Sequence, residues 1–448
     1  MRVFIGLTEI AGYYGNLASG LGELGITSTF VDLREHSFQY GGEAGGRDRL
    51  LDLYRTLSRR RAAVPAGRVL PTLWWAGLQK ACLLGILGKA VMTCDVFIFS
   101  YGTTFLRCRE LPLLKILGKR LIFVFSGSDH RPPYMNGIAL TSLDERTIER
   151  CGELTRQIKG KLRRIERYAD VIVGHHLSAQ LHERPFVPIL LVGIPFATRT
   201  SARAESSSGT SRSVRIVHAP SRPRQKGSAE IKKAIEALRA RGFAIDFVEL
   251  VNKPNQVVLD ELSRCDFVID ELYSDTRMAV LATEAAFFGK PAVVGGYARD
   301  EDLAIEGVYP ASQFPPVQFC HPDDLESAIH ELITDVPYRL ELGKRAQDYV
   351  TSSWTPKKVA QRFVALIENE IPEAWMFDPR SIRYLSGAGM PEAVARAGVR
   401  RFIDMLGLPA LCLSDKPEME RALLAFADGE PELRPHDIER LSTWASKP

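Results

Sequence analysis

The sequence has few cysteines, and their spacing excludes two classes of protein. The seven cysteines are scattered, with no Cys-x-x-Cys pair and no cysteine near a histidine at metal-ligand spacing: Cys82, Cys94, Cys108, Cys151, Cys265, Cys320 and Cys412. We therefore expect neither a disulfide framework nor a structural zinc site. The thiols are typical of a reduced, cytoplasmic protein.

Long uninterrupted apolar runs are also missing. The longest run, residues 70–92, is broken by Gln79, Lys80 and Lys89 before it reaches the roughly 20 apolar residues that a membrane-spanning helix needs. The chain opens on an apolar strand, MRVFIGL, without the basic start and cleavage site of a signal peptide. We therefore expect a cytoplasmic protein.

The charge is divided unevenly between the two halves of the chain. Residues 1–200 contain 27 Lys and Arg against 17 Asp and Glu, a net charge of +10, whereas residues 201–448 contain 31 against 37, a net charge of −6. A basic half suits an anionic partner such as a phosphorylated lipid, a membrane surface or a nucleic acid, although a domain of this size also carries such a charge without a partner. The helix predicted near 70–92 follows the arginines of SRRRAAVPAGR (58–68), and its apolar face either packs in the core or lies on an anionic bilayer. We expect no nucleic-acid partner.

The length and the strand pattern favour two domains. A chain of 448 residues is too long for one ordinary hydrophobic core. Short apolar strands separated by helices are typical of a parallel sheet covered on both faces. Such strands are predicted over 2–7, 27–33, 95–101, 120–126 and 169–174, and again over 214–220, 244–250, 266–270 and 291–296. The sequence therefore predicts an α/β fold of two doubly wound, Rossmann-like domains with a cleft between them.

The composition changes at residues 197–213, where a Ser-, Thr-, Arg- and Gly-rich segment predicts a linker. We expect an N-terminal domain over 1–196, which a helix near 353–371 rejoins, and a second domain over 214–352. Residues 372–448 read as short helices broken by Gly and Pro, and they predict a helical extension.

The first strand-to-helix turn of each half has features that suit a phosphate. Neither turn has the Gly-x-Gly-x-x-Gly spacing of dinucleotide enzymes. Gly12 and Gly15 precede or begin the first helix, so backbone N–H groups there either bind an anion or form a plain turn. In the second half, SRPRQKGS places Arg222, Arg224 and Lys226 at a helix start, where cations oppose the helix dipole. We expect a phosphate to join them, and a solvated basic turn is the alternative.

A polar loop follows the strand predicted at 120–126. The segment VFSGSDHRPPY brings Asp129 and His130 to the edge of the sheet where ligands of α/β proteins bind. His130 is a candidate to transfer a proton or to donate to a leaving phosphate, and Asp129 is a candidate to orient it. The pair also suits a hydrogen-bonded loop turn. His175 and His176 follow another strand and are weaker candidates.

One carboxylate, Glu284, lies in the apolar segment ATEAAFFGKPAVVGG (282–296). The helix predicted over 277–288 is apolar on nearly every side, so we expect it to be buried. A buried carboxylate without a partner is costly. Glu284 is therefore expected to face a cleft, to pair with a cation, or to accept hydroxyl groups of a ligand.

These segments resemble glycosyltransferases of the GT-B fold, and specifically the retaining family 4 group. DFVIDELYSDTRMAVLATEAAFFGKPAVVGG (266–296) resembles the family's strand, helix and Glu-Ala-x-x-x-Gly-Lys-Pro-Val block. VRIVHAPSRPRQKGSAEIKKAIEAL (214–238) resembles its basic turn and Lys-Gly helix start, and FSGSDHRP resembles its His-Gly-x-Asp-x-Arg segment. The resemblance spans about residues 1–370 and does not cover the C-terminal extension.

The resemblance implies roles for individual residues. Glu284 would accept the ribose hydroxyls of a nucleotide-sugar donor, while Lys226 and a neighbouring arginine, Arg222 or Arg224, would hold the diphosphate. Gly295 would come close to the donor.

Two positions depart from the family pattern. Thr276 stands in place of the first glutamate of the family's Glu-x7-Glu pair, so the group that touches the donor sugar differs from the pattern. Ser126 stands in place of the family's usual histidine, so the roles of Asp129 and His130 transfer only weakly.

The resemblance implies a cytoplasmic glycosyltransferase that moves a sugar from a nucleotide-sugar to a glycan or polyprenyl-linked acceptor. It further implies bacterial surface polysaccharide synthesis at the inner face of the membrane, without metal or cofactor and with retention of configuration. A nucleotide-sugar 2-epimerase and a non-catalytic GT-B protein that binds a nucleotide or glycan remain as alternatives.

Overall fold

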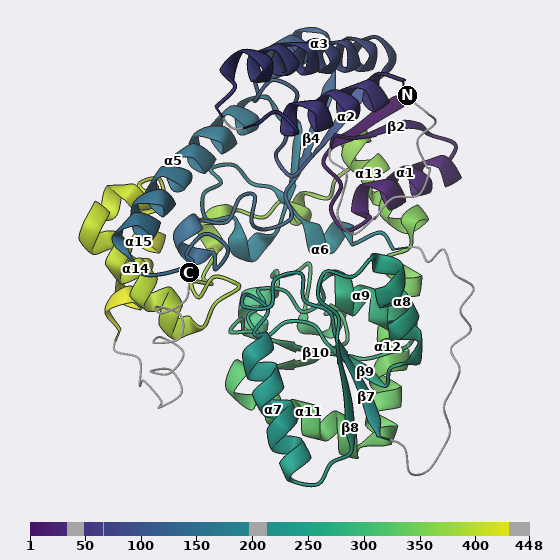
Figure 1. Cartoon of the computed structure of the whole chain (residues 1–448), viewed down its shortest axis with the longest axis vertical. Coiled ribbons are helices and arrows are strands. Elements are labelled where there is room, and N and C mark those ends of the chain that lie inside the picture. The colour runs from purple at the N-terminus through teal and green to yellow at the C-terminus, as the bar shows by residue number, and fades with distance from the viewer. Residues whose placement is uncertain (34–48, 66, 197–212, 430–448) are drawn as a thin grey trace.

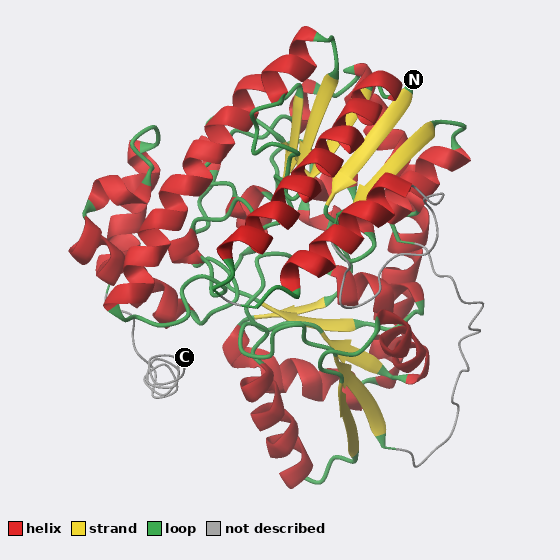
Figure 2. Ribbon diagram, turned by 45° about the horizontal axis from the view of Figure 1, so that its top comes forward, coloured by secondary structure: helices red, strands yellow, loops and turns green. Residues whose placement is uncertain are grey.

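The structure, a computed structural model, describes residues 1–33, 49–65, 67–196 and 213–429 (Figure 1). The linker predicted at 197–213 lies, except for its last residue, outside the described residues. The described chain forms two layered α/β units and a helical extension (Figure 2).

The first unit is built on a parallel sheet with the strand order β2-β1-β3-β4-β5-β6. Its strands are β1 (Arg2–Leu7), β2 (Thr27–Asp32), β3 (Val96–Ser100), β4 (Arg120–Val124), β5 (Val171–Gly174) and β6 (Val187–Pro188). In the register, Phe4 of β1 lies opposite Thr29 of β2 and Phe97 of β3. Because side chains alternate along a strand, Phe4 belongs to the core on one face and Val3 and Ile5 to the core on the other.

Helices cover both faces of this sheet. They are α1 (Tyr13–Glu23), α2 (Arg49–Ala62), α3 (Val69–Thr93), α4 (Leu111–Ile116), α5 (Glu145–Tyr168), α6 (Ile189–Val192) and α13 (Pro356–Glu368). The core on the Phe4 face includes Ile86 of α3, Leu114 of α4 and Leu162 of α5. The opposite core contains Leu17 of α1 and Phe363 of α13. The late helix α13 therefore packs on the sheet of the first unit.

The second unit has a parallel sheet with the order β11-β10-β9-β7-β8. Its strands are β7 (Val214–His218), β8 (Ile245–Glu249), β9 (Phe267–Ile269), β10 (Ala292–Gly295) and β11 (Gln318–Cys320). Its helices are α7 (Ser228–Ala240), α8 (Asn255–Arg264), α9 (Val280–Phe287), α10 (Asp300–Leu303), α11 (Leu325–Thr334) and α12 (Val336–Ser353). Helices α7 and α11 supply one core, and α8, α9 and α12 supply the other. The prediction of two doubly wound parallel sheets is confirmed.

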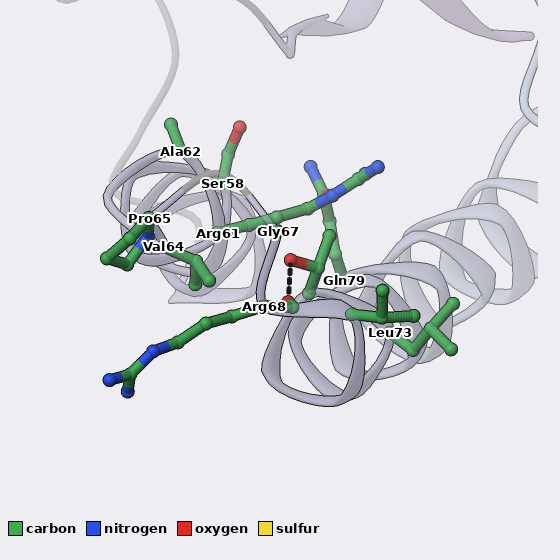
Figure 3. A pocket seen from close by; sticks show the side chains of 11 residues that line it. Ser58, Arg61, Ala62, Val64, Pro65, Gly67, Arg68, Leu73 and Gln79 are labelled. Carbon is green, nitrogen blue, oxygen red and sulfur yellow. Dashed lines mark hydrogen bonds between the residues drawn. The ribbon is translucent and has the colours of Figure 1, made fainter.

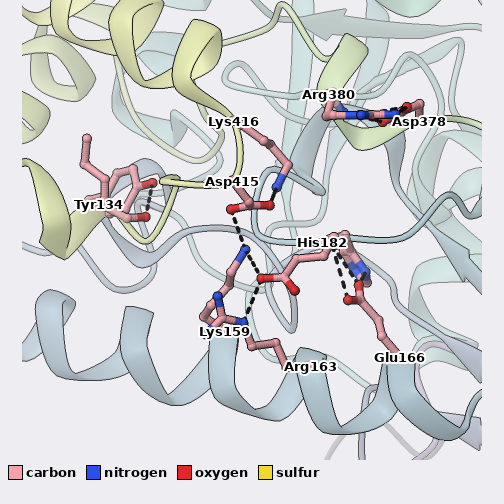
Figure 4. Close-up of polar contacts among 11 residues, drawn as sticks. Tyr134, Lys159, Arg163, Glu166, His182, Asp378, Arg380, Asp415 and Lys416 are labelled. Atoms are coloured by element: carbon pink, nitrogen blue, oxygen red, sulfur yellow. Dashed lines mark hydrogen bonds and ion pairs between the residues drawn. The ribbon is translucent and has the colours of Figure 1, made fainter.

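The extension packs on the first unit. It contains α14 (Glu392–Leu406) and α15 (Pro417–Asp428), and Phe402 and Leu423 join the core beside α5. Lys159 of α5 is almost fully buried and pairs with Asp415 at 3.0 Å and Glu183 at 2.9 Å (Figure 4). Short 3-10 helices lie at η1 (Pro133–Met135), η2 (His176–Ser178), η3 (Ala311–Gln313), η4 (Pro322–Asp324), η5 (Glu373–Trp375), η6 (Pro379–Ser381) and η7 (Leu408–Leu411).

The start of the extension contacts both units. The backbone of Phe377 exchanges two hydrogen bonds with Phe186 of the first unit, and the amide of Gly389 donates to the carbonyl of Tyr273 in the second at 2.8 Å. A buried ion pair between Arg131 and Asp275 also joins the units. The extension therefore contributes to the contacts between the two units.

The helix predicted near 70–92 is α3, and its two halves differ in exposure. Cys82, Ile86 and Ala90 are buried, whereas Leu70 and Trp74 are 81% and 66% exposed. Core packing therefore accounts for the second half of α3 but not for the first. Within the described residues, no helix is both long and apolar enough to span a bilayer.

Candidate functional site

A pocket of about 600 Å³ lies where the carboxyl ends of the two sheets meet. We call it the central pocket. From the first unit it is lined by residues that follow β1, β3 and β4, and from the second unit by residues that follow β7, β8 and β9 or lie in α8 and α9. The polar residues of this lining are Thr8, Glu9, Tyr101, Ser126, Ser128, Ser221, Arg222, Lys226, Asn252, Lys253, Asn255, Asp270 and Glu284. Both sheets reverse their strand order at these strands, between β1 and β3 and between β7 and β9. Such switch points are where open α/β sheets bind ligands.

Glu284 lies on the wall of the central pocket, although its residue is only 2% exposed. The Asn255 side-chain amide donates to Glu284 Oε1 at 2.8 Å, and no cation pairs with this carboxyl among the described residues. Burial raises the pKa of Glu284 to about 8, with Asn255 lowering it and Asp270 raising it. The neutral carboxyl is therefore favoured at pH 7, and a pairing with a cation does not explain its burial.

Helix α9 delivers Glu284 to the pocket and is buried around that position, as its apolar sequence predicts. The helix ends just before Gly289, whose φ of 69° is the left-handed conformation that glycine adopts at helix ends. The helix begins later than predicted, at Val280 rather than at residue 277.

Lys226 also lines the central pocket, but two carboxylates of the chain already contact it. Its Nζ lies 2.6 Å from Glu271 Oε2 and 3.3 Å from Asp270 Oδ1. Burial alone would lower the pKa of Lys226, but Asp270 and Glu271 raise it above its ordinary value. Two carboxylates facing one ammonium leave no spare positive charge here. A diphosphate must therefore compete with Glu271 for Lys226.

The two arginines of the basic turn lie differently. Arg222 is exposed and lines the central pocket. Arg224 is half-buried and is not among the described residues lining that pocket. Of the two candidates, the structure therefore brings Arg222 to the pocket with Lys226.

In the first unit, the turn at Gly12 and Gly15 already holds an anion of the chain itself. The Glu9 carboxylate accepts hydrogen bonds from the amides of Ile10 at 2.7 Å, Tyr14 at 3.1 Å and Gly15 at 2.8 Å. These groups belong to the start of α1, where the prediction placed a phosphate of the donor. A donor phosphate at Gly12 and Gly15 stays a prediction, and it would have to replace Glu9 as the acceptor of these amides.

The sequence alone did not single out Glu9, although its position just after a strand is visible there. It follows β1 by two residues, as Asp270 and Glu271 follow β9. Burial raises the pKa of Glu9 to about 7, against the lowering effect of its three backbone partners. A polar residue just after a buried strand was therefore the available signal for Glu9, Asp270 and Glu271. Asn255 at the start of α8 gave no comparable signal.

Asp129 and His130 lie behind the pocket wall rather than on it. Asp129 Oδ1 accepts from the amides of Ser126 and Gly127, both at 3.0 Å, and burial raises the pKa of Asp129 to about 6. His130 is fully buried. The central pocket is lined instead by their neighbours Ser126 and Ser128. As placed, neither predicted catalytic side chain reaches the pocket, because the loop turns both inward.

His130 ends a buried chain of polar groups. The Glu166 carboxylate lies 2.8 Å from Nδ1 of His182, and His182 Nε2 lies 3.0 Å from Nδ1 of His130. Because the carboxylate accepts, His182 Nδ1–H donates to it and His130 Nδ1–H donates to His182. Burial holds the pKa of His130 well below its usual range, so its ring is neutral. His175 and His176 are buried as well, and burial also lowers the pKa of each.

Thr276 and Gly295 are not among the described residues that line the central pocket. The amide of Thr276 donates to Ser274 Oγ at 3.2 Å within its own loop. A Cβ at Gly295 would lie 2.7 Å from the carbonyl oxygen of Leu272, so glycine is needed for packing against the chain itself. Beside Thr276, the guanidinium of Arg131 holds the pKa of Asp275 below its ordinary value although burial alone would raise it.

Three consecutive acidic residues, Asp300, Glu301 and Asp302, lie in α10. Asp302 accepts from the amide of Arg299, Glu301 pairs with Arg299, and Asp300 pairs with Arg277. In the part of the chain that the structure describes, no group of three or more His, Cys, Asp or Glu side chains is arranged to hold a metal ion.

No family model and no curated protein matches the sequence. Several solved structures are similar in three dimensions. One is the catalytic domain of starch synthase IV from Arabidopsis thaliana bound to ADP and acarbose, at 12% identity over 82% of this chain and 98% of that one, with a TM-score of 0.47. A second is Alr3699/HepE from Anabaena in complex with UDP and glucose, at 11% identity over 82% and 99%, with a TM-score of 0.46. A third is the lipopolysaccharide outer core galactosyltransferase WaaB, at 11% identity over 83% and 100%, with a TM-score of 0.42.

Proposed function

We propose that the protein is a glycosyltransferase that moves a sugar from a nucleotide-sugar donor to a glycan or lipid-linked acceptor. The observation that carries the proposal is the central pocket, where Glu284, Lys226 and Arg222 of the second unit face Glu9, Ser126 and Ser128 of the first. A pocket between two switch points, with the carboxyl groups of Asp270 and Glu284 and three cations, Arg222, Lys226 and Lys253, on one wall, suits a ligand with hydroxyl groups at one end and phosphates in the middle.

The donor would bind mainly to the second unit. Glu284 would accept the ribose hydroxyls, for which its burial beside Asn255 pre-organises it. The diphosphate would lie near Lys226 and Arg222 and would take the place of Glu271 on the Lys226 ammonium. This assignment follows the resemblance at residues 214–296, and the position of Glu284 and Lys226 on one pocket supports it.

The reaction would break the bond between the anomeric carbon and the diphosphate oxygen and form a bond from that carbon to an acceptor hydroxyl oxygen. The products are the glycosylated acceptor, the nucleoside diphosphate and the proton of the hydroxyl group. Negative charge develops on the leaving diphosphate, so Lys226 and Arg222 would stabilise the transition state there. Retention of configuration and independence of metal ions belong to the proposal through the resemblance alone.

We further propose that the protein works at the inner face of a bacterial membrane, in surface polysaccharide synthesis. The supporting surface is the hairpin of α2 and α3, at the end of the molecule opposite the second sheet (Figure 1). There Leu70, Leu73 and Trp74 are exposed beside Arg61 and Arg68, and a cavity of about 500 Å³ opens between the two helices (Figure 3). Exposed leucine and tryptophan next to arginine suit the boundary of an anionic bilayer.

A vesicle sedimentation assay tests this surface. We expect the protein to sediment with phosphatidylglycerol vesicles and not with phosphatidylcholine vesicles, and the double variant Leu70→Glu, Trp74→Glu to lose this binding. Leu340→Glu is the matched control, because Leu340 is 65% exposed on α12 in the second unit. Equal binding by the double variant would remove the hairpin from the membrane contact.

Incubation with a panel of nucleotide sugars tests the activity. Release of nucleotide that depends on a lipid-linked or glycan acceptor would support transfer. Isomerisation of the sugar without an acceptor would identify a nucleotide-sugar 2-epimerase instead. Saturable binding with neither reaction would identify a non-catalytic nucleotide-binding protein.

A further inference from the structure

A second cavity of about 550 Å³ adjoins the central pocket. The two share Tyr101, Ser128 and Arg222 on their walls, and the Tyr101 hydroxyl and Ser128 Oγ are 2.8 Å apart. We call the second cavity the arginine pocket, because Arg146 and Arg150 of α5 and Arg222 of the second unit line it. A ligand in the arginine pocket would therefore lie next to a ligand in the central pocket.

Arg146 and Arg150 lie on the side of α5 that lines the arginine pocket. They lie four residues apart in the first turns of α5, so they are neighbours on one helix face and repel each other. Cations near a helix N-terminus also oppose the helix dipole. Among the described residues, neither side chain has an ion pair or hydrogen bond with a carboxylate.

Carboxylates lie next to the two arginines in sequence, at Asp144, Glu145 and Glu149, but none of them lines the arginine pocket. Asp144 caps α5 by accepting from the amide of Thr147 at 2.7 Å, and it also accepts from the hydroxyl of Ser142. The arginine side chains are exposed, as is that of Arg222. Three guanidinium groups line one open cavity, and each has a planar fork of N–H donors that matches the oxygens of a phosphate.

The remaining wall of the arginine pocket is uncharged and combines polar residues, such as Asn136 and Thr141, with apolar ones. Ile138, Leu154 and Ile158 contribute to it, and Ile138 is 38% exposed. Uncharged surface beside the guanidinium groups suits a ligand that carries more than a bare phosphate ion.

We propose that the arginine pocket binds a phosphate or diphosphate group of the acceptor substrate. The inference rests on the proposed function, because it assigns the central pocket to the donor and leaves this neighbouring cavity for the acceptor. The acceptor would be a phosphorylated molecule whose hydroxyl group reaches past Tyr101 and Ser128 toward the donor sugar. Its phosphate could belong to a lipid-linked sugar or to a soluble sugar phosphate.

Calorimetric titration with two probes tests the proposal and separates these sources. Farnesyl diphosphate represents a lipid-linked diphosphate, and glucose 1-phosphate represents a soluble sugar phosphate. We expect at least one probe to bind saturably, and the double variant Arg146→Ala, Arg150→Ala to weaken that binding about 10-fold or more. Binding of farnesyl diphosphate alone assigns the lipid-linked source, and binding of glucose 1-phosphate alone assigns the soluble one.

Two controls keep the outcome specific. The double variant Arg156→Ala, Arg167→Ala removes the same charge from exposed positions of α5 outside the pocket, and it should bind the probes like the wild type. Lys226→Ala should also leave probe binding unchanged, because Lys226 lines only the central pocket of the two. A probe whose binding depends on Lys226, or equally on Arg156 and Arg167, would overturn the proposal.

Nucleotide binding distinguishes a failure of the acceptor-site proposal from a failure of the proposed function. Nucleoside diphosphate binding should be the same in Arg146→Ala, Arg150→Ala and in the wild type, since neither arginine lines the central pocket. Normal nucleotide binding without any arginine-dependent probe binding would refute the acceptor site alone. Arginine-dependent probe binding without nucleotide binding would refute the donor site alone.

Discussion

Acidic residues lie at the carboxyl edges of both sheets, but their hydrogen-bond partners differ. In the first unit, Glu9 follows β1 and accepts three backbone amides at the start of α1. In the second unit, Glu284 faces the same pocket with one amide partner, Asn255, and Lys226 lies on the pocket wall. The first edge is largely satisfied by its own chain, whereas the second keeps a buried carboxyl and a cation at the surface of the pocket.

This difference shows that a helix N-terminus with backbone N–H groups able to bind an anion is not by itself a ligand site. The turn at Gly12 and Gly15 has the required backbone N–H groups, and Glu9 occupies them. At the second edge, the acidic residues near Lys226 are Asp270 and Glu271, and Glu271 is partly exposed. Our proposal therefore places the donor at the second edge and the acceptor at the first.

Among the variants that distinguish the two edges, we expect Lys226→Ala to have the largest effect, on turnover. Lys226→Ala should lower kcat about 100-fold or more, because it removes a cation from the developing charge of the leaving diphosphate. The assay is transfer from whichever nucleotide sugar the panel identifies, with a thermal melt to verify folding. Lys232→Ala is the control, since Lys232 lies in α7 outside the pocket and pairs with Glu249 of β8 at 2.8 Å. A wild-type rate for Lys226→Ala would remove Lys226 from the mechanism.

The counterpart in the first unit is Glu9→Ala. It should lower the free energy of unfolding by about 1–2 kcal/mol, because the amides at the start of α1 lose their acceptor. Its nucleoside diphosphate affinity should stay at the wild-type value. Chemical denaturation and calorimetry measure the two quantities. A variant that keeps its stability but gains or loses nucleotide affinity would show that Glu9 belongs to the donor site.

The pH dependence of stability distinguishes Glu284 from an ordinary surface carboxylate. Its folded-state pKa is about 8, above the ordinary value of 4.5, so between these values the folded protein keeps a proton that the unfolded chain has released. The stability that this proton provides is complete below pH 4.5 and is lost as the pH rises through 8. Glu284→Gln should remove about 1.4 kcal/mol per pH unit from the slope of unfolding free energy between pH 5.5 and 7.5. Equal slopes in denaturation experiments would mean that Glu284 is ionised in the folded protein.

The smallest effect concerns the competition at Lys226. Glu271→Gln removes the carboxylate that lies 2.6 Å from the ammonium, so a diphosphate no longer has to displace it. We expect nucleoside diphosphates to bind about 3- to 10-fold more tightly, as the loss of about 1 kcal/mol of a competing ion pair implies. Weaker binding measured by calorimetry would instead make Glu271 a direct ligand of the nucleotide.

Most of the fold could be predicted from the sequence, because buried parallel strands are apolar over their whole length. The strands expected at 2–7 and 27–33 correspond to β1 and β2 within one residue at each end. Strands β6 and β11 were missed, since two or three residues carry too little pattern. Helix α2 was also missed, as its mainly polar sequence shows only a narrow apolar side.

The candidate site was predictable only in part. Glu284 stands out because a charge in an apolar helix needs a reason, and Lys226 because a basic turn opposes a helix dipole. The sequence could not tell that Asp129 and His130 turn inward, because that depends on how Glu166 and His182, distant in the chain, pack around them. Nor could it reveal the arginine pocket, whose walls come from both units.

The most direct test of the central claim is calorimetric titration with a panel of nucleoside diphosphates, comparing the wild type with Glu284→Gln. The account predicts saturable binding of at least one nucleotide by the wild type. We expect binding to be about 2- to 12-fold weaker in Glu284→Gln, because the hydrogen bonds of a neutral carboxyl contribute about 0.5–1.5 kcal/mol. Equal affinity of the two proteins, or no binding of any nucleotide by the wild type, would contradict it.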